Sequence, residues 1–337
     1  MAATIRDVAR AAGVSQSTVS RALNGSGYVS PATRARVLAA AAQLHFRPSH
    51  VARSLVSKAT HTLGLLLPDI TNPFFPAIAR GVEDAAARAG YAVILCNTDR
   101  DPAHEEHYLA ILRQRQVDGL VLIASSAAVG HRIARADFPA VVFVDRVPPG
   151  AEADAVVVDN REGVRTATRH LLGLGHRRIA FVGGSAGSGT SEDRLAGYLA
   201  ALAEAGLNPD PGHIRAGDFT YDGGYAAGRA LLGSPDRPTA VVAANDLMAI
   251  GVLRAAAELG LRVPDDVAVV GYDDIPLAGM LNPPLTTVAQ PTYEMGERAA
   301  RMLLERLAGK APPEPRRVVL PARLVVRRSC GAGRDGQ

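Results

Sequence analysis

Forked hydrogen-bonding side chains and flat aromatic rings stand just after many of the short aliphatic runs of this 337-residue sequence. Carboxylate, amide and guanidinium groups can each hold two adjacent hydroxyls, and a phenyl ring can cover the aliphatic face of a sugar. For any single member, a loop cap or turn residue is the ordinary alternative. Their number at run ends favours a binding site for a neutral polyol, lined by Asn72, Phe74, Phe75, Asp145, Arg146, Arg194, Phe219, Asn245, Asp273 and Gln290.

Aliphatic runs that alternate with amphipathic segments must position these side chains. The runs span residues 63–67, 92–95, 119–123, 140–144, 155–158, 179–182, 240–244, 267–271 and, more briefly, 285–288. Helical windows lie between most of them, at residues 74–89, 104–116, 161–174, 192–205, 222–232 and 247–259. Such alternation predicts parallel sheets covered on both faces, and the division near residue 160 predicts two of them. Ligands of such sheets bind beyond the carboxyl ends of the strands, in the cleft between facing subdomains.

The first 24 residues predict a site of a different kind. Two short helical patterns there are separated only by residues 12–14, where Gly13 supplies the backbone freedom that a tight turn needs. The second pattern, capped by Ser15, exposes short hydrogen-bonding groups and one Arg, which suit base edges and phosphates in a DNA major groove. An ordinary helical hairpin with a polar face is the alternative. The residues expected to contact DNA are Thr4, Ser15, Gln16, Ser17, Thr18, Ser20, Arg21 and Asn24.

The charge distribution favours DNA over the plain hairpin. Residues 1–60 contain eight Lys or Arg and one acid, Asp7, which gives a net charge of +7. Because the whole chain carries +4, residues 61–337 carry −3. Basic charge is thus confined to the segment that holds the hairpin, as in a DNA-binding head on a neutral-to-acidic body. A third helix is expected at residues 32–45, with Ser30 and Pro31 at its N-cap and first position.

These patterns divide the chain into a head, a linker and an α/β core. We predict a helix-turn-helix head at residues 1–47, a hinge helix and linker at 48–61, and a core at 62–337. The core is expected to hold two interleaved subdomains, at about 62–159 and 160–290, with a segment at 291–329 returning across them. No early apolar run resembles a signal peptide and none reaches the ~18 residues that span a bilayer, so we expect a cytoplasmic protein.

Metal, disulfide and enzyme chemistry are poorly matched. Cys96 and Cys330 give neither a disulfide framework nor metal-ligand spacing, and the cluster at residues 104–107 (His104, Glu105, His107) is more typical of a solvated helix face, so we expect no metal and no cofactor. The pattern of Gly183, Ser185 and Gly187 fits the nucleophile elbow of α/β-hydrolases, but His213 is the only later histidine and comes too soon to complete a triad. Residues 184–190 lack the Lys of a phosphate-binding loop. We predict that the chain is not an enzyme.

Motifs along almost the whole chain resemble those of the lactose-repressor family of bacterial transcription regulators. They are TIRDVARAAGVSQSTVSRALN at 4–24, VARSL at 51–55, DGL at 118–120, VDR at 144–146, GHRRIAFVGG at 175–184, RLAGY at 194–198, AND at 244–246, VVGYDD at 269–274 and PPLTTVAQP at 283–291. The resemblance implies a helix-turn-helix head, a hinge helix and a core like the periplasmic sugar-binding proteins. It also implies a dimer, or a dimer of dimers, on palindromic operator DNA.

The resemblance assigns roles to single residues of the head and hinge. Gln16, Ser17 and Arg21 occupy the base-reading places of the recognition helix. Leu55 matches the hinge leucine that family members insert into the minor groove at the operator centre, where it kinks the duplex, and Ala52 packs beside it.

The predicted cleft also resembles the contact pattern of the periplasmic ribose-binding protein, which favours ribose or a related monosaccharide as the effector. A purine-sensing relative would be expected to carry a further basic side chain in the loop before Arg194, where this chain has residues 187–189, Gly-Ser-Gly. A purine or a sugar phosphate remains the alternative effector. A transport receptor would share the cleft but would need a signal peptide and no basic head. The sequence therefore predicts a DNA-binding repressor, switched by a small sugar, with the sign of the switch and the choice of dimer or tetramer left open.

Overall fold

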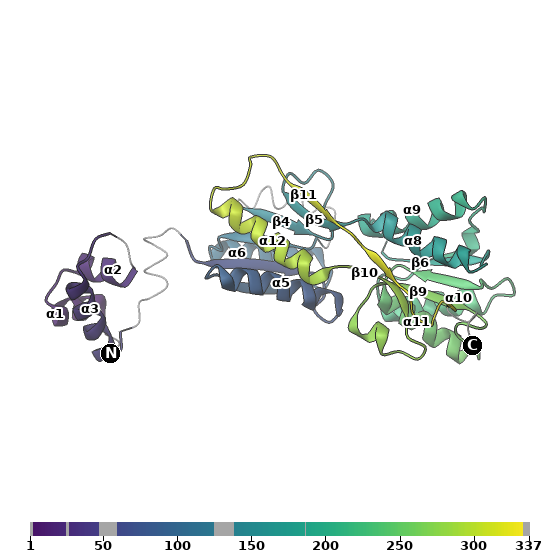
Figure 1. The fold of residues 1–337 in the computed structure, drawn as a ribbon, viewed down its shortest axis with the longest axis horizontal. Helices are drawn as coiled ribbons and strands as arrows, with labels where there is room; N and C mark the ends of the chain where they lie inside the picture. The colour runs from purple at the N-terminus through teal and green to yellow at the C-terminus, as the bar shows by residue number, and fades with distance from the viewer. Residues whose placement is uncertain (1–2, 25–26, 47–58, 125–137, 186, 333–337) are drawn as a thin grey trace. The chain divides into compact units, whose positions relative to one another are not determined.

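The structure is a computed structural model that describes residues 3–24, 27–46, 59–124, 138–185 and 187–332. The chain forms two compact units, Met1–Thr60 and His61–Gln337, called here the head unit and the core unit (Figure 1). The hinge residues Ala52 and Leu55, which the sequence places on DNA, lie outside the described residues.

The head unit is a bundle of three helices. These are α1 (Ile5–Ala12), α2 (Gln16–Asn24) and α3 (Pro31–Gln43). Gly13 adopts the left-handed conformation, with φ of 64°, directly after α1, and its N–H bonds back to the carbonyl of Arg10. Ser30 accepts a hydrogen bond from the Thr33 N–H and so caps α3, as predicted. The helix-turn-helix fold expected from the sequence is confirmed, and its core consists of Val8, Ala9, Ala12, Val19, Ala22, Val37, Ala40 and Ala41.

The first subdomain of the core unit is built on a parallel six-stranded sheet. Its order is β11-β5-β4-β3-β1-β2, from β1 (Thr62–Leu67), β2 (Ala92–Asn97), β3 (Gly119–Leu122), β4 (Val141–Val144), β5 (Asp154–Val158) and β11 (Arg317–Leu320). One face packs against α5 (Phe74–Arg88) and α12 (Thr292–Leu307), and the other against α6 (Pro102–Gln114). Burial on both faces explains why these strands are continuous aliphatic runs.

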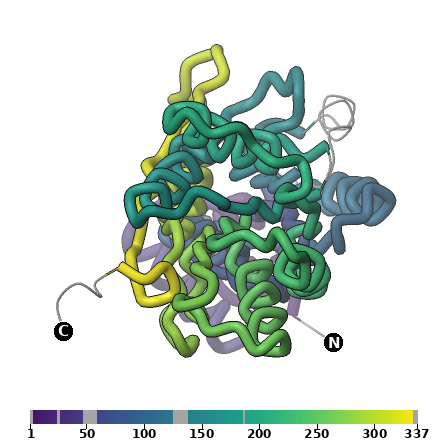
Figure 2. The backbone as a smooth tube through the Cα atoms, turned by 90° about the vertical axis from the view of Figure 1, so that its right-hand side faces the viewer, coloured from purple at the N-terminus to yellow at the C-terminus, as the bar shows by residue number. Residues whose placement is uncertain are grey.

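The second subdomain repeats this plan. Its sheet has the order β12-β10-β9-β8-β6-β7, from β6 (Ile179–Gly183), β7 (Ile214–Ala216), β8 (Ala240–Ala243), β9 (Ala268–Asp273), β10 (Thr286–Ala289) and β12 (Arg323–Val325). All pairs are parallel except β10 with β12. The helices α8 (Asn160–Gly173) and α9 (Gly189–Glu204) cover one face, and α10 (Tyr221–Leu232) and α11 (Asp246–Glu258) the other (Figures 1 and 2). The α/β class with two parallel sheets is confirmed.

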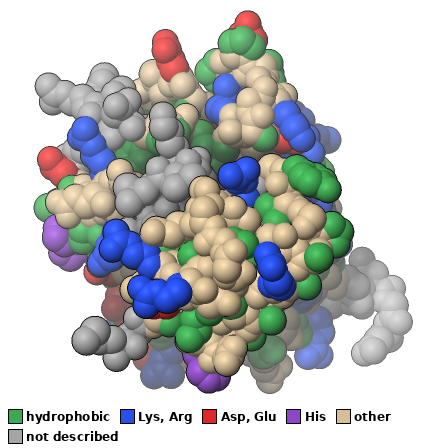
Figure 3. Space-filling view, turned by 90° about the vertical axis from the view of Figure 1, so that its left-hand side faces the viewer, with side chains coloured by type: hydrophobic (Ala, Val, Ile, Leu, Met, Phe, Trp, Pro, Cys, Tyr) green, Lys and Arg blue, Asp and Glu red, His purple; other side chains and the backbone are tan. Residues whose placement is uncertain are grey.

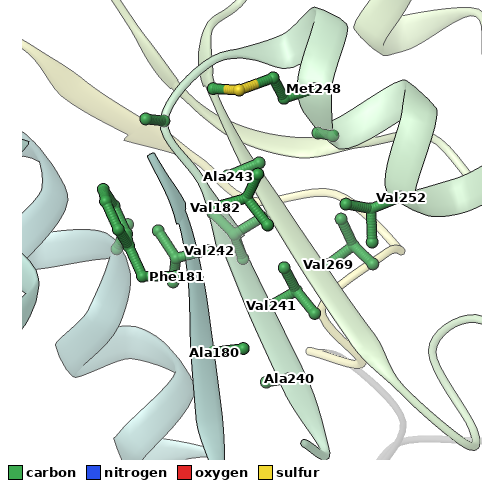
Figure 4. Packing of buried hydrophobic residues seen from close by; sticks show 14 of the residues in the cluster. Ala180, Phe181, Val182, Ala240, Val241, Val242, Ala243, Met248, Val252 and Val269 are labelled. Atoms are coloured by element: carbon green, nitrogen blue, oxygen red, sulfur yellow. The ribbon is translucent and has the colours of Figure 1, made fainter. Parts of the chain in front are cut away.

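The core of the second subdomain shows how packing fixes the positions of these strands. Phe181 of β6 and Val242 of β8 lie side by side on one face of the sheet, while Val182 of β6 and Val269 of β9 lie on the other face, toward Val252 of α11 (Figure 4). Each of these side chains is at most 1% exposed. Such burial contributes about 1.5–3 kcal/mol for each large aliphatic or aromatic side chain. The sheet is therefore a rigid base for the loops at its edge.

Three segments of the chain cross between the two subdomains. The chain passes from β5 to α8, returns from β10 to α12, and passes again from β11 to β12. The short elements β7, β11 and β12 were not among the predicted runs. They lie at sheet edges or are half exposed, so their sequences lack the continuous aliphatic character of buried strands.

Helix pairs in each subdomain approach so closely that glycine is required at their contacts. A Cβ atom on Gly81 of α5 would overlap the carbonyl oxygen of Tyr293, at the start of α12. Gly296 of α12 stands in the same relation to the carbonyl of Ile78. The helices α5 and α12 are therefore packed backbone to backbone.

We predict that Gly81→Ala lowers the free energy of unfolding of the core by about 1–3 kcal/mol, because the new methyl group forces apart two backbones that cannot bend away. Gly173→Ala is the matched control, since a Cβ there meets no atom within 4 Å and α8 gains a better helix former. Urea unfolding followed by circular dichroism measures both. Equal stability of the two variants would contradict the close-contact explanation.

Candidate functional site

A small cavity of about 20 Å³ lies where the carboxyl ends of the two sheets face each other. It is lined by nine of the ten residues that the sequence places there, together with Arg100 and Thr190. The tenth, Gln290, is buried and donates a hydrogen bond of 2.7 Å from Nε2 to Asp273 Oδ1. The parallel arrangement explains this convergence, because parallel strands end at the same edge of their sheet. The predicted set therefore comes together in one place, from both subdomains.

Arg194, near the start of α9, is the most tightly held member of the cavity. Its Nε donates to Asn160 Oδ1 at 2.8 Å, and its Nη1 donates to the carbonyl of Ala244. The guanidinium carbon lies 3.9 Å from the centroid of the Tyr272 ring, a cation–π contact. Asp273 Oδ1 lies 3.8 Å from Nη1. A buried, planar donor is thus presented to the cavity in one orientation.

Several buried polar atoms around the cavity have no hydrogen-bond partner among the described residues. They are Asp145 Oδ1, Arg146 Nε and Gln290 Oε1. Arg146 Nε lies 3.5 Å from Asp145 Oδ2, too far and too poorly aligned for a hydrogen bond. Since a buried polar group without a partner costs about 1–3 kcal/mol, these atoms mark a place for a polar ligand. Two acceptors and one donor match a molecule rich in hydroxyls.

Two of the predicted amides also have structural roles. Asn245 accepts from the Met248 N–H at the start of α11 and donates to the carbonyl of Phe219. Asn72 accepts from the Phe74 N–H at the start of α5. The Asn245 oxygen caps α11, and the Asn72 oxygen closes a turn just before α5, which are ordinary roles for Asn. Their contribution to a ligand is limited to the remaining amide hydrogens.

The aromatic walls of the cavity are Phe74, Phe75 and Phe219. Phe219 sits under two guanidinium groups, those of Arg146 at 5.2 Å and Arg194 at 5.8 Å from its ring centroid. A Cβ on Gly184 would overlap this ring, so only glycine leaves room for it. The ring is therefore positioned from two directions.

Three residues that carry cavity side chains adopt left-handed backbone conformations. The φ angles are 62° for Asp145, 60° for Phe219 and 111° for Asp273. Such conformations are strained for residues other than glycine and persist where the surrounding structure enforces them, commonly at functional sites. Asp273 ends β9, so the strain re-aims its carboxylate at the cavity.

Burial dominates the electrostatics of the cavity. It raises the pKa of Asp273 to about 7, against the opposing effects of Arg194 and the Gln290 hydrogen bond. It also raises the pKa of Asp145 and lowers that of Arg146. Asp246, behind Asp273, has a strongly raised pKa for the same reason and bonds to the Ile275 N–H and the Thr287 hydroxyl. A ligand that donates hydroxyl protons would stabilise the charged form of these carboxylates.

The head unit presents its predicted DNA-contacting side chains mainly on α2 and the turn before it. Ser15, Gln16, Ser17 and Arg21 are exposed. The Ser15 hydroxyl lies within 2.8 Å of Ser17 Oγ and 2.9 Å of Thr18 Oγ1. Basic side chains stand out on the face that Figure 3 presents.

Some of the side chains predicted to contact DNA already form hydrogen bonds within the head unit or are partly buried. The Thr4 hydroxyl donates to Asp7 Oδ2 at 2.7 Å in the cap of α1, so its proton is engaged within the protein. Ser20 is half buried on α2, and Asn24 is the last residue of that helix. Arg21 Nε bonds to the Ser17 carbonyl at 3.4 Å, and its two terminal nitrogens make no hydrogen bond within the described residues. Arg21 is thus the strongest candidate for a bidentate contact.

The residues that suggested enzyme or metal chemistry in the sequence have the following surroundings in the structure. No hydrogen bond joins Ser185 to a histidine within the described ranges, and His213 Nε2 lies 2.9 Å from the carbonyl of Asp236. His104 and His107 are exposed on α6, but Glu105 is fully buried, so this helix face is not uniformly solvated as the sequence suggested. In the part of the chain that the structure describes, no group of three or more His, Cys, Asp or Glu could hold a metal ion.

Comparisons with known proteins assign the two units. Residues 4–49 match the family described as bacterial regulatory proteins, lacI family, and residues 168–330 match the periplasmic binding protein-like domain. The ribose operon repressor of Escherichia coli (strain K12) is 43% identical over 307 residues, which cover 90% of this chain and 93% of that protein. The chain belongs to the lacI family of bacterial regulatory proteins.

Two further proteins are similar to this chain over nearly its full length. The HTH-type transcriptional repressor PurR of Photobacterium profundum is 38% identical over 97% of this chain and 98% of its own length. The crystal structure of the Lac repressor dimer bound to operator and the anti-inducer ONPF superposes with a TM-score of 0.88, at 30% identity over 98% and 99% of the two chains. This lacI-family chain is a DNA-binding transcription regulator with a helix-turn-helix head and a periplasmic-binding-protein-like core.

Sequence reasoning missed residues of this regulator's cavity that have no motif of their own. Arg100 follows β2, and Thr190 opens α9. Asn160 and Tyr272 hold Arg194 in place, and Gly184 admits the Phe219 ring. The position of Arg100 after an aliphatic run was an available signal, since the same rule found the other strand-end residues. The residues that hold Arg194 and admit the ring act through neighbours that only the fold supplies.

We predict that Arg21→Ala weakens specific DNA binding by roughly 1–3 kcal/mol and relaxes base preference, because a bidentate contact to guanine is lost. Binding isotherms on specific and random duplexes at one salt concentration measure both effects. Arg36→Ala, an exposed arginine on α3, is the control for the general loss of one positive charge. An equal loss on both duplexes for Arg21→Ala would assign this residue to the phosphate backbone.

Effector affinity should depend on pH through Asp273. Because burial raises its pKa to about 7, the carboxyl is protonated below that pH, and a hydroxyl-donating ligand then loses its best acceptor. We predict that affinity falls as the pH decreases below about 7, by at most about tenfold per pH unit. Calorimetric titrations between about pH 5.5 and pH 8 test this. An Asp273→Asn variant should bind weakly with a flat profile, and a flat wild-type profile would refute the assignment.

Proposed function

We propose that this regulator represses transcription as a homodimer on a palindromic operator, and that ribose or a related monosaccharide in the cavity lowers its operator affinity. The observation that carries the effector assignment is the set of buried, unpartnered atoms on Asp145, Arg146 and Gln290, enclosed by phenyl rings. Hydroxyls satisfy these acceptors and the donor, and the rings cover the apolar face of a sugar. The chain acts by binding, without catalysis.

Similarity to known repressors does not identify the effector of this chain, so the effector is inferred from the chemistry of the cavity. The ribose operon repressor and the repressor PurR both match over nearly the whole chain. The loop before Arg194 carries Gly187, Ser188 and Gly189, with no basic side chain to meet a purine, which supports the sugar. A sugar phosphate or a purine remains the alternative that the experiment below distinguishes.

The switch follows from the position of the cavity between the two subdomains. A ligand that contacts both of them favours the arrangement in which they lie close, and it can shift the protein only by its differential affinity for the two arrangements. The chain crosses between the two sheets three times, and in the proposed mechanism the subdomains rotate against each other about these crossings. In the proposed mechanism this rotation reaches the hinge segment with Ala52 and Leu55, and the hinge releases the operator centre.

DNA affinity and its control are divided between the two units. The net charge of +7 on residues 1–60 supplies binding that is steeply salt-dependent and largely independent of sequence. Specificity then depends on a few side chains of α2 and on how easily the operator centre kinks. Since the operator lies on the bacterial chromosome, the protein works in the cytoplasm. No helix among the described residues is long and apolar enough to cross a membrane.

Replacing Asp273 by Ala should abolish the effector response and leave operator binding nearly intact, because the substitution removes two acceptors from the cavity and touches nothing in the head. Operator complexes are titrated with ribose, other pentoses, hexoses, their phosphates and purines at fixed salt, and the fraction released is measured. Glu83→Ala, which removes an exposed carboxylate from α5, is the control and should respond like the wild type.

The panel also decides between effectors. Release by ribose or another free monosaccharide that disappears in the Asp273→Ala protein supports the proposal. Release by purines alone, release by sugar phosphates alone, or release that persists in the variant would each overturn the sugar assignment.

A further inference from the structure

Arg100 connects the two subdomains across the mouth of the cavity. It follows β2 in the first subdomain, where its Nη2 lies 3.1 Å from Asp69 Oδ2. Its Nη1 donates to the carbonyl oxygen of Asp218, in the second subdomain, at 3.2 Å. A single planar guanidinium thus bonds to both sides. The geometry of one fork suits two acceptors held at a fixed separation.

The end of this contact in the first subdomain is firmly anchored. The Arg100 N–H bonds to the carbonyl of Pro68 at 3.1 Å, and the Ile70 N–H bonds to Asn97 Oδ1 at 2.7 Å. Asp69 Oδ1 accepts from the N–H and the hydroxyl of Thr71, which leaves Oδ2 for the guanidinium. The loops after β1 and β2 therefore form one unit that aims Arg100 at the other subdomain.

The end in the second subdomain leads directly to the cavity wall. Asp218 and Phe219 are consecutive and both left-handed, with φ of 53° and 60°. The Phe219 ring fills the space above Gly184 and faces Arg146. A bond to the Asp218 carbonyl restrains the peptide that carries this ring, at the place where the backbone is strained.

We propose that Arg100 is a positioning residue for the effector: it holds the Asp218 carbonyl, and through it the Phe219 ring, in the place that the bound sugar requires. This inference rests on the proposed sugar effector and adds the residue that keeps the cavity closed around it. Because the contact joins two bodies that separate on opening, it slows dissociation of the ligand and has little effect on its association.

The expected effect follows from the loss of one hydrogen bond between the subdomains. Arg100→Ala should raise the dissociation constant and the dissociation rate constant of ribose about three- to tenfold, with the association rate constant unchanged within about twofold. Arg100→Lys keeps the charge but cannot reach both acceptors with a planar fork, so its loss is intermediate. Asp69→Asn keeps the oxygen that serves Thr71 and replaces the oxygen that orients Arg100, so it should resemble Arg100→Ala.

The experiment uses the full-length protein in a Tyr221→Trp background. The chain contains no tryptophan, so the indole introduced at this position, two residues after Phe219, reports on this loop alone. Stopped-flow fluorescence gives the two rate constants for ribose, calorimetry gives the dissociation constant, and thermal unfolding without ligand reports on the fold. Arg80→Ala is the matched control, because Arg80 is an exposed arginine of the same subdomain with ion pairs only to Glu83 and Asp84 among the described residues.

The outcomes separate this proposal from the one on which it rests. A faster dissociation in Arg100→Ala and Asp69→Asn, with an unchanged melting temperature and no further loss in the double variant, supports it. Wild-type kinetics in Arg100→Ala, or a loss explained by a lower melting temperature, overturns it while the sugar assignment stands. If the parent protein binds none of the sugars in the panel, the sugar effector and the role of Arg100 fail together.

Discussion

The burial of the Arg194 guanidinium is the constraint on which the cavity depends. This side chain is 4% exposed, and a buried charge costs several kcal/mol unless it is paired and hydrogen-bonded. Asn160, the Ala244 carbonyl and the Tyr272 ring meet that requirement, with Asp273 as the nearest counter-charge. Arg194 therefore requires the start of α8 and the ends of β8 and β9 to lie in fixed relation to α9. The Arg194 guanidinium is therefore already oriented to donate hydrogen bonds to a ligand.

Because the subdomains are rigid, contacts made in the cavity can affect the position of one whole subdomain relative to the other. In each one, helices pack backbone to backbone at glycine, as Gly81 shows for α5 and α12, and the strands are buried on both faces. Packed bodies of this kind change by moving against one another, since their interiors do not deform continuously. The contacts that cross the cavity, from Arg100 to Asp218 and from Arg146 to Phe219, are then the ones that a ligand can strengthen.

The head unit differs from the core unit in having a small hydrophobic core and a high positive charge. Its core is small and rich in alanine, and residues 1–60 carry a net charge of +7 while residues 61–337 carry −3. Long-range attraction to DNA therefore belongs to a part of the protein that has no share in the cavity, and effector control has to pass through the chain between the two units. Because the two sites belong to different units, substitutions that alter the ligand of the cavity leave the DNA-contacting residues unchanged.

The sequence by itself determined the local features. Gly13 and the apolar spacing around it defined the helix-turn-helix, the aliphatic runs defined the buried strands, and the polar residues after those runs gave the cavity set, because strand ends converge in any parallel sheet. Only the tertiary structure decided which additional residues matter. Arg100 gains its role from Asp69 and Asp218, and Gly184 from Phe219. Such contacts join segments far apart in the chain, and spacing along a sequence carries no information about them.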